Sequence, residues 1–200
     1  MAAPIDFYFD FSSPYGYLAA QEVDALGARQ GREVVWRPFL LGAVFKTTKQ
    51  EPLLNVPIKG DYARRDMARC ARLIGVPFTL PEPFPFSAVA ACRAVYWLAD
   101  RDAAQAKRLA QALYHVAFGE GRDIAPAETV AEIASEQGQH RDEVLAALGD
   151  PAVKDRLKRE VEAAQDAGVF GSPFLLVDGE PFWGHDRLSH AEKWLETGGW

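Results

Sequence analysis

The sequence predicts an α/β domain in which a small mixed sheet is interrupted by a large all-helical insertion. Two observations lead to this fold class. Strand-type alternation of side chains is confined to the two ends of the 200-residue chain. The residues between these ends mostly show the spacing of apolar positions that is typical of amphipathic helices.

The N-terminal part predicts a strand, a helix and a second strand. Residues Ile5 to Phe11 alternate Ile or Phe with Asp or Tyr, which indicates a strand. Ser13 followed by Pro14 is typical of a helix start, and the apolar positions behind it extend the helix to about Gln30. A turn leads into a second strand over Val34 to Trp36. Because this is the order of a βαβ unit, we expect the two strands to be parallel.

The pattern of apolar residues in the middle of the chain predicts a loop followed by a block of helices. Residues Leu40 to Pro57 lack clean periodicity, so we expect a long loop. Residues Gly60 to Gly168 have helical patterns that are broken at Gly75 to Ser87 and at Gly119 to Pro126. The clearest helix of the block follows Asp150, which has the character of a helix cap.

The C-terminal part predicts a hairpin and a last helix. Strands over Phe174 to Val177 and Glu180 to Gly184 are joined by Asp178-Gly179, a pair that favours a two-residue turn. We expect Asp186 to cap the following helix, and Gly198 with the next glycine to end it. With the helical block removed, the remaining topology indicates a thioredoxin-like domain of residues 1–40 and 168–200. Residues 41–167 are then the linker loop and the inserted helical domain, which should cover the sheet and form one wall of a cleft.

Composition excludes several classes of function. The net charge of −6 argues against a nucleic-acid partner. No apolar run approaches the roughly 18–20 residues of a membrane span, and no signal peptide is evident, so we expect a cytoplasmic protein. Cys70 and Cys92 lack a CxxC partner, and the four histidines show no ligand spacing beside them. We therefore expect no metal site, and we interpret both cysteines as small apolar residues.

Three stretches are candidates for a site. Ser13 stands where a strand ends and a helix begins, a place that favours an anion, although on position alone an ordinary helix cap is the better explanation. Ser172-Pro173 is either a functional turn or a plain start of a strand. Arg187 lies in the first turn of the last helix, where a cation opposes the helix dipole, so another interaction is expected to hold it there.

The pattern of motifs resembles the 2-hydroxychromene-2-carboxylate isomerases, which are close to kappa-class glutathione transferases and to DsbA-like thioredoxin proteins. The stretches that carry the resemblance are DFYFDFSSPYGYLA, RPFLLGAVFK, NVPIKGDY and GVFGSPFLLVDGEPFWGHDRL. They occur in the order of the family and are spread over nearly the whole chain. The combination is specific, whereas each piece alone is weak.

The resemblance implies glutathione as cofactor. Ser13 occupies the place of the first cysteine in the C-x-x-C motif of DsbA-like oxidoreductases, so disulfide exchange at this place is excluded. Its hydroxyl would instead hold the thiolate of glutathione. A hydrogen bond to a charged group contributes about 1.5–3 kcal/mol and a helix N-terminus about 0.3–1 kcal/mol, enough to lower a thiol pKa from about 8.5 to around 6–7. The resemblance assigns glutathione binding to Ser13, Ser172, Pro173, Gly184, His185, Asp186 and Arg187.

Within this group the resemblance implies distinct tasks. The Ser172-Pro173 bond is expected to be cis, with the Ser172 backbone at the cysteinyl part of glutathione. Asp186 and Arg187 suit the γ-glutamyl zwitterion. His185 stands where family members often have Asn, so only its backbone is expected to contribute.

The resemblance also implies a flat aromatic carboxylate as substrate. Lys46 and Asn55 would serve its carboxylate and phenolic oxygen, and Phe84 and Trp183 its rings; Val56 belongs to the same group. Solvated loop positions explain Lys46 and Lys59 equally, and core packing explains Phe84 and Phe86 at least as well.

The implied reaction interconverts 2-hydroxychromene-2-carboxylate and trans-o-hydroxybenzylidenepyruvate, in a dimeric enzyme as in relatives. Two other classes of function stay open at this point. One is a kappa-like glutathione transferase or peroxidase, which needs the same thiolate. The other is a non-catalytic DsbA-like binding module, which would not bind glutathione.

Overall fold

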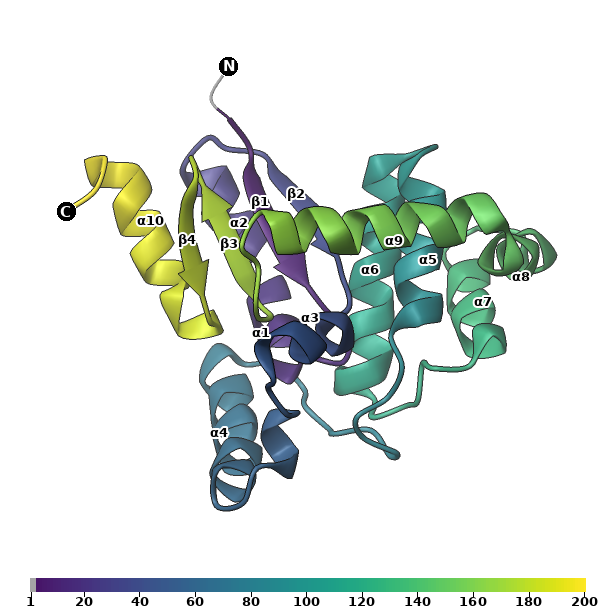
Figure 1. Cartoon of the computed structure of the whole chain (residues 1–200), viewed down its shortest axis with the longest axis horizontal. Helices are drawn as coiled ribbons and strands as arrows, with labels where there is room; N and C mark the ends of the chain where they lie inside the picture. Colours follow the sequence, from purple (N-terminus) through teal and green to yellow (C-terminus); the bar gives the residue numbers. More distant parts are fainter. Residues whose placement is uncertain (1–2) are drawn as a thin grey trace.

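A four-stranded mixed sheet is built from the two ends of the chain. The computed structural model describes residues 3–200. Strand β1 (Ile5–Phe9) pairs in parallel with β2 (Val34–Pro38) and antiparallel with β3 (Phe174–Val177), which pairs antiparallel with β4 (Glu180–Trp183). The strand order is β2-β1-β3-β4, and the mixed sheet and its parallel first pair agree with the sequence prediction (Figure 1).

The central strand is covered on both faces. Phe7 and Phe9 on one face are fully buried, as the alternation predicts. On the other face Tyr8 is 8% exposed and Asp10, just past the strand, is 2% exposed. The alternation therefore marks a strand correctly, but its polar residues do not mark a solvent face.

The predicted first helix is two short helices. Helix α1 (Pro14–Ala20) is followed by α2 (Val23–Arg29). At the junction Gln21 and Glu22 donate their backbone N–H groups to carbonyls three residues earlier, which tightens the turn and separates the helices.

The prediction of a long loop from Leu40 to Pro57 is wrong for the first half of this segment. Residues Leu41–Thr48 form helix α3, and Leu53–Asn55 form a 3₁₀ turn. Helix α3 buries only Val44 and has no side-chain cap on Leu40, so it leaves almost no signal in the sequence. The carboxylate of Asp10, just past β1, accepts the Leu41 N–H instead, and this partner is remote in sequence.

The remaining helices lie between β2 and β3, as predicted. They are α4 (Lys59–Ile74), α5 (Val89–Ala99), α6 (Ala103–Tyr114), α7 (Ala127–Glu136), α8 (Arg141–Gly149) and α9 (Pro151–Asp166). Helices α5 to α8 gather on one side of the sheet, α9 runs back from them to β3, and α4 lies past the end of the sheet near α1 (Figure 1). No helix within residues 3–200 combines the length and the apolar character that crossing a bilayer requires. The division into two domains at residues 40 and 168 stays a prediction.

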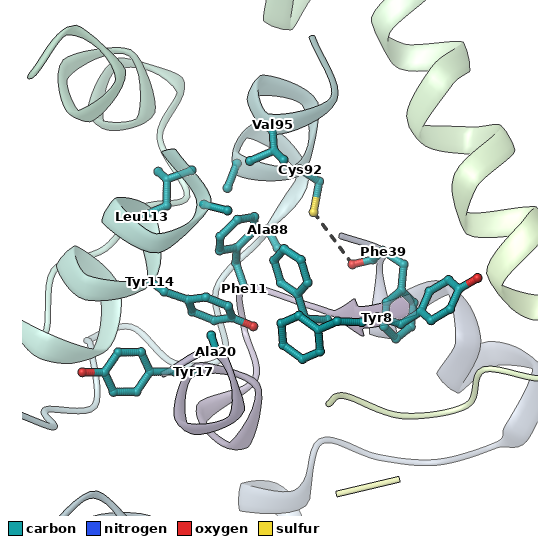
Figure 2. Close-up of a cluster of buried hydrophobic side chains, with 14 of the residues drawn as sticks. Tyr8, Phe11, Tyr17, Ala20, Phe39, Ala88, Cys92, Val95, Leu113 and Tyr114 are labelled. Carbon is teal, nitrogen blue, oxygen red and sulfur yellow. Dashed lines mark hydrogen bonds between the residues drawn. The ribbon is translucent and has the colours of Figure 1, made fainter. Parts of the chain in front are cut away.

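Aromatic side chains join the helices to the sheet. The rings of Phe9 and Phe11 lie 5.4 and 4.9 Å from that of Tyr114, which lies 6.3 Å from Phe118. Tyr114 and Phe11 meet in the centre of the buried cluster in Figure 2. The buried hydroxyl of Tyr96 donates to the carbonyl of Pro38 at 2.7 Å. The inserted helices thus complete the core of the sheet, as their apolar faces require.

The C-terminal hairpin has the predicted turn. Asp178 and Gly179 both have positive φ values, 53° and 89°, as this class of two-residue turn requires. Helix α10 (Leu188–Thr197) follows a 3₁₀ turn at His185–Arg187, so its cap position is Arg187 and the expected capping by Asp186 is wrong. Gly198 ends the helix in the left-handed conformation, as predicted.

Replacing Tyr96 with Phe tests the junction between helices and sheet. We expect Tyr96→Phe to lower the free energy of unfolding in urea by about 1–2 kcal/mol, because a buried hydrogen bond to a β2 carbonyl is lost. Tyr62→Phe is the matched control, since Tyr62 is 62% exposed and should stay within about 0.5 kcal/mol. If the two variants are equally stable, the hydrogen bond from Tyr96 does not stabilise the contact between the helices and the sheet.

Candidate functional site

Ser13 caps α1 and also reaches a second loop. It precedes the helix in extended conformation, and its Oγ accepts the Gly16 N–H at 3.0 Å. The same hydroxyl donates to the carbonyl oxygen of Ser172 at 2.8 Å. The residue is 5% exposed. The cap interpretation is therefore correct but incomplete, because the hydroxyl also joins two segments that are remote in sequence.

The Ser172-Pro173 turn is the second part of the site. Its peptide bond is cis, as the resemblance implies. The Ser172 Oγ accepts the backbone N–H of Asp10 at 3.0 Å, and the carbonyl of Pro173 accepts the N–H of Gly184 at 3.1 Å. Hydrogen bonds therefore bring the Ser13 turn, the Ser172-Pro173 turn and the segment after β4 together.

The segment Gly184–Arg187 is the open part of the site. Gly184 has a φ of 115°, and an added Cβ would lie 2.5 Å from Asp186 Oδ1, so glycine is required there. The side chains of Asp186 and Arg187 are 72% and 46% exposed, and their nearest oxygen and nitrogen are 3.4 Å apart. This loose and accessible pair leaves one anion and one cation available to a ligand.

The side chain of His185 points away from this open segment. Its Nε2 lies 2.8 Å from Glu22 Oε2, and only 13% of the side chain is exposed. Glu22 lies between α1 and α2, so the contact fastens the segment to the first helices. The imidazole is thus engaged by Glu22, and the expected contact of the His185 backbone with a ligand stays a prediction.

Asp10 is a site residue that the sequence reasoning missed. Its carboxylate accepts the Ser12 N–H and O–H at 2.7 and 2.8 Å and the Leu41 N–H at 2.6 Å. Its carbonyl oxygen accepts the Tyr114 hydroxyl and the Ser13 N–H, both at 2.9 Å. Burial raises the pKa of this carboxyl, and the hydrogen bonds from Ser12 and Leu41 oppose the rise. The one signal in the sequence is an Asp two residues before a Ser, a spacing that permits a side-chain-to-backbone turn.

Tyr15 links the first turn of α1 to α4. Its hydroxyl donates to Asp66 Oδ2 at 2.8 Å, while Arg69 donates to Asp66 Oδ1 at 2.6 Å. Burial and the adjacent carboxylate raise the pKa of Tyr15 well above its usual value. This phenol is therefore a neutral donor that fixes α4 beside the site, and nothing local in the sequence indicates it.

Neither cysteine is activated. Burial raises the pKa of Cys92 well above its usual value, and its Sγ lies 3.8 Å from the Phe39 carbonyl (Figure 2). Burial and the carboxylate of Asp66 raise the pKa of Cys70. Any thiolate at this site must therefore come from a bound molecule.

The residues expected on the substrate side are less closely gathered. Lys46 is exposed in the last turn of α3, and Asn55 is exposed next to half-buried Val56. Trp183 is 53% exposed, with its ring 5.0 Å from that of Phe170.

The aromatic residues of the proline-rich loop belong to a buried cluster. Half-buried Phe84 packs 6.2 Å from Phe86 and 6.4 Å from Phe118, and Phe86 is only 7% exposed. Packing thus accounts for Phe86, while Phe84 keeps part of its ring accessible.

Chemically, the site combines a rigid anion-stabilising end with an open end of mixed charge. The first has a hydroxyl and the start of a helix; that helix has only seven residues, so the hydroxyl is the stronger contributor. The second has an exposed carboxylate and guanidinium that pair only loosely with each other, at 3.4 Å. A small molecule with an anionic group toward Ser13 and a zwitterionic group toward Asp186 and Arg187 would match both ends.

Known proteins share this architecture. The family described as DSBA-like thioredoxin domain matches residues 4–196. A 2-hydroxychromene-2-carboxylate isomerase of Sphingobium xenophagum is 30% identical, with 98% of this chain and 99% of the relative covered. A kappa 2 glutathione S-transferase of Caenorhabditis elegans is 26% identical, with 96% and 91% covered.

The likeness extends to a solved structure of a 2-hydroxychromene-2-carboxylate isomerase. It superposes with a TM-score of 0.87 at 27% identity, over 96% of this chain and 94% of the other. The match covers the sheet and the inserted helices alike, which confirms the predicted thioredoxin-like fold. The chain belongs to the DSBA-like thioredoxin family and, within it, to the family of the 2-hydroxychromene-2-carboxylate isomerases.

Proposed function

We propose that the protein is a glutathione-dependent isomerase that interconverts 2-hydroxychromene-2-carboxylate and trans-o-hydroxybenzylidenepyruvate. The isomerase relatives support the reaction class. The observation that carries the proposal is the convergence of three segments: Ser13 bonds to Ser172 at 2.8 Å, and Gly184 bonds to Pro173 at 3.1 Å. The register of the sheet brings these three segments together, so a ligand that spans them would find a hydroxyl, a cis-proline turn and a charged pair in one place.

The donors and charges of the site fit glutathione. The γ-glutamyl end carries an ammonium and a carboxylate, which match the exposed Asp186 and Arg187. The backbone of Ser172 would hold the cysteinyl part, as an added strand holds its partner. When bound, glutathione would supply a thiolate whose reversible addition to the unsaturated pyruvate permits rotation about its double bond.

Ser13 has one task in this scheme, to stabilise the ionised sulfur. Its hydroxyl hydrogen is directed at the Ser172 carbonyl, so the hydroxyl must turn toward the ligand when the thiolate is present. The Gly16 N–H bond to Oγ holds the oxygen in place during this turn. Ser13 is therefore a hydrogen-bond donor and not a nucleophile.

The substrate would lie on the α3 side of the site. Lys46 would bind its carboxylate, Asn55 its phenolic oxygen, and Trp183 with Phe84 its rings. The three residues Lys46, Asn55 and Trp183 are exposed and free to adapt to a ligand. A cytoplasmic homodimer is the expected state, by resemblance to the family, and sedimentation equilibrium measures the dimer directly.

Titration of glutathione into the wild type and Ser13→Ala tests the proposal. We expect the wild type to bind with the ultraviolet band of a thiolate at neutral pH. Ser13→Ala should bind about 10-fold more weakly or worse, and its bound thiol pKa should rise toward about 8.5, because a hydrogen bond to a charged group is lost. Conversion of 2-hydroxychromene-2-carboxylate should fall with the thiolate fraction.

Asp150→Ala is the matched control for that experiment. Asp150 caps α9 by accepting the Ala152 N–H at 2.8 Å, so the variant loses a helix cap of about 1 kcal/mol far from the site. It should bind glutathione as the wild type does. A wild type that binds no glutathione would sink the catalytic proposal and leave Ser13 as a cap.

Arg187→Ala tests the γ-glutamyl end. We expect glutathione to bind roughly 2- to 5-fold more weakly, since the guanidinium is partly exposed and screened. Cysteinylglycine lacks the γ-glutamyl group and should bind both proteins equally. Lys193→Ala, an exposed cation on α10, is the control. If Arg187→Ala weakens the binding of glutathione and of cysteinylglycine equally, Arg187 contacts a part of the ligand other than the γ-glutamyl group.

A kappa-like transferase is a second candidate, because kappa-class relatives also match nearly the full chain. Both reactions need the same thiolate, so Ser13 does not separate them. Product analysis does: the isomerase releases glutathione unchanged, whereas a transferase consumes it and forms a thioether with an electrophilic substrate.

A further inference from the structure

The carboxylate of Asp10 divides its two oxygens between different elements. Oδ1 accepts both hydrogen bonds from Ser12, next to Ser13, at 2.7 and 2.8 Å. Oδ2 accepts the N–H of Leu41, the first residue of α3, at 2.6 Å. Asp10 is 2% exposed, so the carboxylate forms a rigid bridge within the core between the Ser13 turn and α3.

No side chain of its own cap residue fixes where helix α3 begins, because Leu40 supplies no side-chain oxygen. The helix is otherwise held by packing: Val44 is buried, and Leu40, Leu41 and Ala43 are partly buried against the core. A carboxylate at its first N–H is stabilised by the positive end of the helix, and the charge makes the hydrogen bond short and strong. Lys46 lies in the last turn of the same helix.

A carboxylate suits this position better than an amide. All three of its partners are donors: two N–H groups and one hydroxyl. Both carboxylate oxygens accept, whereas an asparagine would direct its own N–H₂ group at one of the backbone N–H groups. Two side chains face Asp10 from the helices, the thiol of Cys92 on α5 and the phenol of Tyr114 on α6. Both are neutral, and each directs its hydrogen at a backbone carbonyl instead of the Asp10 carboxylate.

We propose that Asp10 is a positioning residue that fixes α3, and with it Lys46, at a set distance from Ser13. This inference rests on the proposed function, since Ser13 would hold the thiolate and Lys46 the substrate carboxylate. One buried side chain then sets the separation of the two groups between which the substrate must fit. Asp10 touches neither ligand in this scheme.

Leu41→Pro removes one partner of this bridge without touching Asp10. Proline lacks the N–H, and it is tolerated at the first position of a helix. The preceding Leu40 has φ −113° and ψ 106°, the extended conformation that a following proline requires. Leu41→Ala is the matched control, because it also loses the leucine side chain but keeps the N–H.

The first measurement is amide hydrogen exchange over residues 42–48, which needs no ligand. We expect exchange there to be about 10-fold faster in Leu41→Pro and in Asp10→Asn than in Leu41→Ala, with exchange in α1 unchanged in Leu41→Pro. Unchanged exchange in α3 would overturn the role of Asp10, whether or not the protein is an isomerase.

The second measurement is the kinetics of isomerisation. Leu41→Pro should raise KM for the chromene carboxylate about 10-fold while kcat and glutathione affinity stay within about 2-fold. The effect of Lys46→Ala on KM should largely disappear in the Leu41→Pro background, because the lysine is then already misplaced. If the effects of Leu41→Pro and Lys46→Ala on KM are fully additive, Asp10 does not act through Lys46.

The two proposals fail in different ways. If the wild type has no isomerase activity but α3 exchanges faster in Leu41→Pro and Asp10→Asn, the proposed function is wrong and the bridge from Asp10 to α3 is retained. An active enzyme with additive effects and unchanged exchange would retain the function and remove Asp10 from it.

Discussion

The antiparallel pairing of β1 with β3 is the constraint on which the site depends. It sets Ile5 opposite Val177 and Tyr8 opposite Phe174, two stretches at opposite ends of the chain. The residues that follow β1 and those that precede β3 therefore meet at one edge of the sheet. Ser13 and Ser172 are within hydrogen-bonding distance for this reason, and the register of the pair decides which residues meet.

The site has a rigid half and an adaptable half. Around Ser13 the polar groups are buried and bonded to one another, so little reorganisation is available except the turn of a hydroxyl. Around Asp186, Arg187, Lys46 and Trp183 the side chains are exposed and loosely paired. Such a division suits an enzyme that holds the reacting group of a cofactor in a fixed pose, while exposed side chains adapt to the rest of the cofactor and to the substrate.

The inserted helices contribute to the rigid half of the site. Tyr114 packs its ring against Phe9 and Phe11 and donates its hydroxyl to the carbonyl of Asp10. The Tyr15–Asp66 hydrogen bond holds α4 against α1 in a similar way. The turn Ser13-Pro14-Tyr15-Gly16 at the start of α1 carries no thiol, so it presents a hydroxyl at this place in the fold.

The sequence by itself determined the elements whose causes are local. Ser13 before Pro14, Asp150 before Pro151 and the Asp178-Gly179 turn each carry their signal within a few residues, and each was predicted correctly. The segment proposed to bind the cofactor was also singled out from the sequence, because its motif is contiguous, and its role stays a prediction. Tertiary structure alone decided the burial of Asp10, the start of α3 and the engagement of His185 by Glu22. Each of these depends on a partner at least 30 positions away, as the separations of 31 for Asp10–Leu41 and 163 for Glu22–His185 show. A polar side chain gives the same local pattern whether it faces water or a remote donor, so the fold had to be known before these contacts were.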